Sequence, residues 1–103
     1  MNENQSLEHL ILSQTEKIAA SQQLDFLYEN EYNEVLGQIV QRDEGGSIAE
    51  TLLMFRLEIN ETKGTGEIIY YQSSGEFKRQ KFDVEDAQTI LAVLTFIKEY
   101  IAV

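Results

Sequence analysis

Residues 51–82 have the sequence TLLMFRLEINETKGTGEIIYYQSSGEFKRQKF, in which three apolar segments are separated by two glycine-containing turns. From Thr51 to Ile59 apolar side chains recur at every second position, with Leu53, Phe55 and Leu57 on one side. A period of two predicts a β-strand with one buried face. The side chains expected on its other face are Leu52, Met54, Arg56 and Glu58.

The rest of this stretch predicts two further strands. The KGTG sequence at 63–66 is typical of a turn, and residues 67–72 follow it with isoleucine and tyrosine side chains that favour a strand. The SSG sequence at 73–75 predicts a second turn, which leads into a strand at 77–82. Residues 51–82 therefore predict an antiparallel meander of three strands.

A strongly apolar helix is expected after this meander. Asp83 is the candidate N-cap, so the helix is predicted to run from Val84 almost to the end of the chain. One apolar stripe of this helix is sufficient to cover the sheet. A second stripe contains Phe96 and Tyr100, and it must be covered either by the N-terminal part of the chain or by a partner subunit.

The N-terminal residues predict another amphipathic helix. It is expected to begin near Ser6, because Leu7, Leu10, Ile11 and Ile18 follow at helical spacing. Polar residues at the next positions of that stripe predict a break near residues 20–23.

Residues 24–41 have two interpretations. Their apolar side chains recur at intervals of three and four, which favours an amphipathic helix. Gly37, Asn30 and Asn33 are poor helix formers, and residues 35–42 followed by Asp-Glu-Gly-Gly also resemble one arm of a hairpin. We expect helix through most of the segment, with residues 35–42 as the piece that favours a strand.

These elements together predict an α+β fold. We expect a two-layer sandwich with an N-terminal helix or helix pair, an antiparallel meander of three strands, and a C-terminal helix packed on one face. Residues 35–42 would add a fourth strand. The length of 103 residues suits a single domain that covers residues 1–103.

Several function classes find no support in the sequence. The absence of cysteine excludes disulfides, thiolate nucleophiles and zinc sites with sulfur ligands. His9, the only histidine, has no neighbouring catalytic group and is expected to be exposed. With no phosphate-binding, hydrolase or metal-site motif in the chain, we expect no catalytic, cofactor or metal-binding residues. No segment has the length and apolarity of a membrane span, so a cytoplasmic location is expected.

The charge distribution raises two nucleic-acid hypotheses. The net charge of −10 opposes binding to phosphate backbones, so nucleic acid is not the expected partner. Glu29, Glu31 and Glu34 on a helix would instead imitate the phosphates of a duplex, as in an inhibitor of a DNA-binding enzyme. The basic residues of strand 77–82, which lie among aromatic residues, are the other candidate, for single-stranded nucleic acid. Protection of a sheet edge is the favoured explanation for these basic residues.

Elimination leaves protein binding as the expected function. We interpret the chain as a small acidic, non-enzymatic protein-interaction module of the regulator, adaptor, chaperone or immunity type. The partner is expected to be another protein, and a homodimer is the alternative. The candidate interaction residues are Phe96, Tyr100, Glu29, Glu31 and Glu34.

Overall fold

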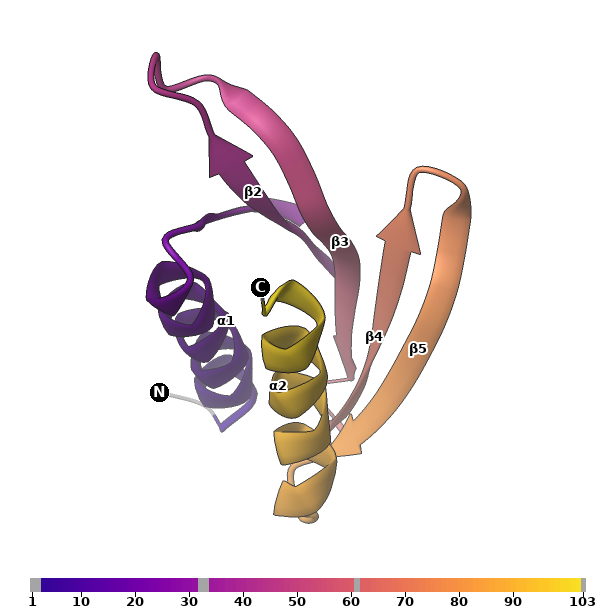
Figure 1. Cartoon of the computed structure of the whole chain (residues 1–103). Helices are drawn as coiled ribbons and strands as arrows, with labels where there is room; N and C mark the ends of the chain where they lie inside the picture. The colour runs from indigo at the N-terminus through magenta and orange to yellow at the C-terminus, as the bar shows by residue number, and fades with distance from the viewer. Residues whose placement is uncertain (1–2, 32–33, 61, 103) are drawn as a thin grey trace.

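The chain forms an α+β fold with one sheet and two helices. The computed structural model describes residues 3–31, 34–60 and 62–102. In the sheet each strand pairs antiparallel with the next, in the order β1-β2-β3-β4-β5. Helices α1 and α2 lie side by side against one face of the sheet (Figure 1). The bounds are α1 Glu3–Ser21, β1 Asp25–Glu31, β2 Glu34–Arg42, β3 Ile48–Asn60, β4 Thr65–Gln72, β5 Gly75–Asp83 and α2 Ala87–Ile101.

The predicted fold class is confirmed, but the sheet has five strands where we expected three or four. The helix expected through most of residues 24–41 was wrong, because this segment forms β1 and β2, but the strand favoured for residues 35–42 is confirmed as β2. Pairing with β3 determines the outcome. It places Val35 and Ile39 of β2 opposite Leu57 and Leu53, and all four side chains are buried. Long-range burial on the sheet thus outweighs the helical spacing of the apolar residues.

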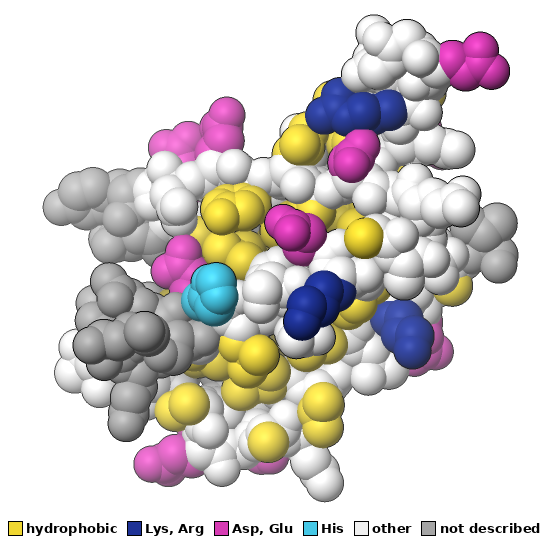
Figure 2. Space-filling view, turned by 90° about the vertical axis from the view of Figure 1, so that its left-hand side faces the viewer, with side chains coloured by type: hydrophobic (Ala, Val, Ile, Leu, Met, Phe, Trp, Pro, Cys, Tyr) yellow, Lys and Arg dark blue, Asp and Glu magenta, His cyan; other side chains and the backbone are white. Residues whose placement is uncertain are grey.

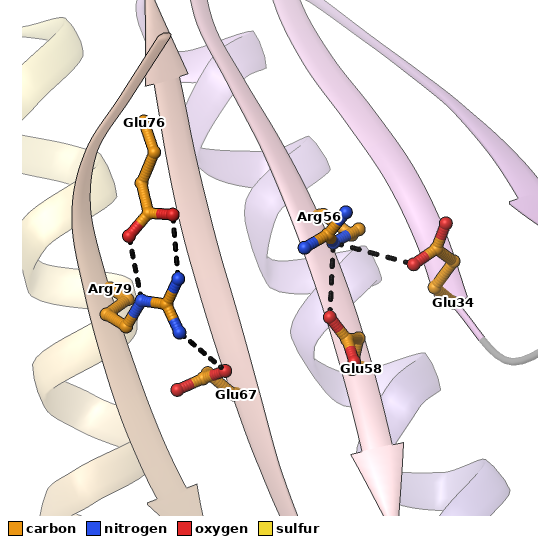
Figure 3. Close-up of polar contacts among 6 residues, drawn as sticks. All are labelled: Glu34, Arg56, Glu58, Glu67, Glu76 and Arg79. Atoms are coloured by element: carbon orange, nitrogen blue, oxygen red, sulfur yellow. Dashed lines mark hydrogen bonds and ion pairs between the residues drawn. The ribbon is translucent and has the colours of Figure 1, made fainter.

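The core lies between the helices and one face of the sheet. Along β3 the predicted alternation is confirmed, since Leu53, Phe55 and Leu57 are buried and belong to the core cluster. The strand begins at Ile48, three residues before the predicted start. Its buried side chains contact the buried faces of α1 and α2 through a single hydrophobic cluster. The other face of the sheet, which we call the open face, points away from both helices (Figure 3).

The first helix begins earlier than expected and ends as expected. Its first residue is Glu3, so Ser6 lies within the helix and is not its N-cap. The predicted break near residues 20–23 is confirmed. Gln23 has a φ of 61°, and the amide of Leu24 donates to the carbonyl of Ala19 over 2.9 Å. A left-handed residue with such a bond is a common way to end a helix. No helix within the described residues is long and apolar enough to cross a membrane.

The second helix begins three residues later than predicted. Its N-cap is Asp86, whose carboxylate accepts from the Gln88 amide at 3.1 Å. The predicted cap, Asp83, instead ends β5, where its carboxylate accepts from the Glu85 amide at 2.9 Å. Both aspartates are suited to such bonds, because a short carboxylate reaches the amide two residues along the chain. The predicted N-cap was therefore wrong by three residues.

Candidate protein-interaction surface

Phe96 and Tyr100, two of the predicted interaction residues, belong to an aromatic cluster within the chain. The ring centroid of Phe96 lies 4.5 Å from that of Tyr70 and 5.5 Å from that of Tyr100. The Tyr100 ring stacks on Phe77 of β5 at 5.4 Å, and its hydroxyl accepts a hydrogen bond from Gln72. Both residues are half-buried. The second apolar stripe of α2 is therefore covered largely by strands β4 and β5.

The three predicted glutamates lie on strands, so the acidic helix that they were expected to form does not exist. Glu29 and Glu31 are on β1, and Glu34 is on β2. Phe26 stacks on the buried ring of Phe55, which places Phe26 on the face that the helices cover. Because side chains alternate along a strand, Glu29 and Glu31 point to the open face.

The strand register places glutamates side by side across the open face. Glu31 pairs with Glu34, Glu34 with Glu58, and Glu58 with Glu67. Adjacent strands lie about 4.8 Å apart, and like charges at that separation disfavour the folded sheet. Lys81 of β5 completes the row. We call these residues the acidic row.

Two arginines on the open face offset this repulsion (Figure 3). The Arg56 Nε atom lies 3.1 Å from Glu58 and 3.5 Å from Glu34, and it has no hydrogen-bond partner among the described residues. Its contact with both carboxylates is thus an ion pair. The guanidinium of Arg79 donates two hydrogen bonds to Glu76, at 2.7 and 2.8 Å, and lies 3.5 Å from Glu67. The hydrogen bond from Arg79 lowers the pKa of the exposed Glu76 carboxyl.

An apolar groove lies beside these ion pairs on the open face. It has a volume of about 600 Å³. Leu36 and Met54 lie on interior strands of the sheet, yet 38% and 36% of their surfaces remain exposed. The guanidinium of Arg56 leans toward the groove, 5.9 Å from the ring centre of Tyr71. The residues that line the groove include Leu27, Leu36, Met54 and Tyr71, together with Glu29, Gln38, Gln72 and Arg56.

The sequence contained only part of the signal for this groove. Alternation along residues 51–59 correctly placed Met54 and Arg56 on the face opposite the core. Leu27 and Leu36 were missed, because a helical interpretation of most of residues 24–41 does not show which side chains would share one face of a sheet. Tyr71 follows the buried Tyr70, so strand alternation alone would have indicated its direction.

A second hollow, of about 900 Å³, lies where β3 and β5 end and β4 begins. It is wide and shallow, and both acidic and basic side chains line it, including Glu67, Arg79 and Lys81. Arg79 is paired with Glu67 and Glu76, so part of the charge around this hollow is already neutralised within the chain.

Two of the aromatic residues that frame the basic strand are unavailable for stacking on single-stranded nucleic acid. Tyr70 and Phe82, two of the neighbouring aromatic rings, are buried in the core. Lys78 lies over the Phe96 ring, with its Nζ atom 4.9 Å from the ring centre. β5 is an edge of the sheet, so its basic side chains lie where protection of an edge places them.

His9 is exposed on α1, as expected, and a histidine is visible on the surface in Figure 2. On that side of the molecule, hydrophobic side chains form separate small patches among polar and charged ones (Figure 2). Among the residues that the structure describes, no group of three His, Asp or Glu side chains is arranged to hold a metal ion.

Comparison with protein-family models, with curated proteins and with solved structures finds no match to this chain. Its function is therefore inferred from the geometry of its own surface.

Proposed function

We propose that the chain is a non-enzymatic protein-interaction module that binds a partner protein through the apolar groove on the open face of its sheet. The observation that carries the proposal is the exposure of Leu36 and Met54 on interior strands. Apolar side chains gathered in a hollow, with a few polar groups around them, are the usual composition of a binding surface.

The surroundings of the groove support this proposal. Arg56 and Tyr71 lie together at the groove, and arginine and tyrosine are enriched among the residues that dominate binding energies. Gln38 supplies an amide group that both donates and accepts hydrogen bonds, while the Gln72 amide already donates to the Tyr100 hydroxyl. Apolar anchors with nearby polar groups favour specific binding over indiscriminate adhesion.

The groove replaces Phe96 and Tyr100 as the proposed anchor. Those two rings pack against Tyr70 and Phe77 within the chain, so little of their surface is free for a partner. The acidic residues Glu29, Glu31 and Glu34 remain part of the proposal, because they lie on the same open face as the groove. The nucleic-acid-mimicking inhibitor loses the helical spacing on which that hypothesis depended.

Site-specific photo-crosslinking tests the proposal. A photoreactive amino acid is placed at Leu36 or Met54, and the protein is illuminated in cells of its native host. We expect a defined crosslinked species from both positions, because each side chain lies in the groove. A crosslink between two copies of the chain would make the groove a homodimer interface.

The matched controls are Leu10 on α1 and Leu91 on α2, which are 42% and 58% exposed. Both are exposed leucines on the helices, outside the groove. Crosslinks that form at Leu10 or Leu91, but not at Leu36 and Met54, would contradict the proposal and place the interaction on the helical layer.

A further inference from the structure

We infer that the partner segment that occupies the groove is basic and amphipathic. Its apolar side chains would lie against Leu36 and Met54, and its lysines or arginines would lie against the neighbouring glutamates of the open face. This inference rests on the proposed function and adds the chemical class of the partner.

Carboxylates lie in and beside the groove. Glu29 lines the groove directly, and it pairs in register with Leu36. Glu31 and Glu34 follow in the adjacent acidic row, where they are neighbours across β1 and β2. A partner that lies on the groove and reaches past its end therefore meets carboxylates first, and a cationic segment is the one that they attract.

Among the described residues that line the groove, Arg56 is the one base. Its Nε atom lies between the carboxylates of Glu34 and Glu58. Two negative charges around one positive charge leave this site with a net charge of −1. An anionic partner would thus gain little from Arg56 and would be repelled by the acidic row.

A second copy of the chain is a less favourable occupant of the groove than a basic segment. In a two-fold symmetric dimer the same patch lies on both sides of the interface. Where the two-fold axis passes close to Glu29, Glu31 and Glu34, these residues of one copy lie near their equivalents in the other. Like charges placed together across an interface oppose association. Charge complementarity thus favours a different, basic protein segment over self-association.

The test uses a synthetic 14-residue peptide of leucine and lysine, with leucines at helical spacing, and measures its affinity by isothermal titration calorimetry. The comparison peptide has glutamate in place of every lysine. We expect the lysine peptide to bind with one-to-one stoichiometry and the glutamate peptide to show no binding. Replacing the apolar anchors in the double variant Leu36→Ala/Met54→Ala is expected to weaken binding about tenfold.

Charge-matched variants separate local attraction from the effect of total charge. The triple variant Glu29→Gln/Glu31→Gln/Glu34→Gln removes three carboxylates near the groove. The control, Glu8→Gln/Glu16→Gln/Glu99→Gln, removes three carboxylates from the helices and changes the net charge equally. We expect about a tenfold loss of affinity for the first variant. The control should change affinity by less than about twofold, because charges beyond roughly 8 Å are screened at physiological salt.

Each other outcome overturns the inference in a distinguishable way. If the glutamate peptide binds as well as the lysine peptide and the Leu36→Ala/Met54→Ala variant weakens both, the groove binds protein but does not select a basic partner. If the two triple glutamine variants lose affinity equally, the binding depends only on the total charge of the protein. If the protein is a dimer by light scattering and the same alanine variant makes it monomeric, the occupant is a second copy. Binding that survives the alanine variant would contradict the proposed function as well.

Discussion

Gly37 shows how a single residue determines the packing of the sheet. A β-carbon at this position would lie 2.6 Å from the Phe55 ring and 3.0 Å from the Phe26 ring. Phe55 is only 2% exposed, so its ring has no space into which to move. In the sequence this glycine argued against a helix. The structure explains its presence in a strand, because two aromatic rings pack across β2 at this position.

Replacement of Gly37 by alanine should destabilise the protein, because the added methyl group overpacks the core. We expect a loss of about 1–3 kcal/mol in the free energy of unfolding, measured by urea denaturation. Gly45→Ala is the control, since its β-carbon would meet only the Asp43 side chain, at 3.4 Å. A Gly37→Ala protein as stable as the wild type would show that the rings do not pack as described.

Tyr70 should make folding sensitive to alkaline pH. Its side chain is buried, its hydroxyl donates to Gln80 Oε1 at 2.6 Å, and burial raises its pKa above the ordinary value of 10.0. Above pH 10 the unfolded chain loses this proton while the folded chain retains it. The stabilising contribution is therefore complete below pH 10 and is lost as the pH rises further.

The variant Tyr70→Phe should reduce this alkaline loss of stability. At neutral pH it should cost about 1 kcal/mol, because Gln80 loses its partner. Urea denaturation at neutral and alkaline pH measures both effects. Tyr28→Phe, at an exposed position on β1, should alter neither. An unchanged pH profile in the Tyr70→Phe variant would show that another group causes the alkaline transition.

At the scale of elements, the sequence correctly predicted the strands in which apolar side chains alternate as the buried side chains do. Residues 51–82 alternate because one face of each strand is buried, and the three strands form there as expected. β1 was not predicted, and β2 was predicted only as an alternative for residues 35–42, because apolar residues at intervals of three and four also fit a helix. Only their pairing with β3, which is distant in sequence, resolves the ambiguity. The groove was not predicted for the same reason, since Leu27 and Leu36 lie on these strands.

The start of α2 gives a prediction at this scale. Asp86→Ala should destabilise the protein by about 1 kcal/mol, because it removes the acceptor of the Gln88 amide at the helix N-cap. Asp86→Asn retains a capping oxygen and should lie within a few tenths of a kcal/mol of the wild type. Thermal denaturation distinguishes the two variants. Equal stability of the alanine and asparagine variants would contradict the assignment of Asp86 as the cap.

At the scale of the whole molecule, the two faces of the sheet have different roles. The helices cover one face and build the core, while the open face carries the acidic row and the apolar groove. The net charge of −10 was evident from composition, but the alignment of four glutamates across neighbouring strands was not. The row arises from the register of β1 to β4, which no local pattern of residues specifies.

The central claim is that the groove on the open face is the binding surface, and Met54 tests it directly. The chain has two methionines, so isotope labelling of the methionine methyl groups gives few signals, and Met54→Leu assigns that of Met54. Addition of the leucine–lysine peptide should shift the Met54 signal, with saturation at the concentration found by calorimetry. A Met54 signal that stays unchanged when the protein is saturated with peptide would contradict the claim.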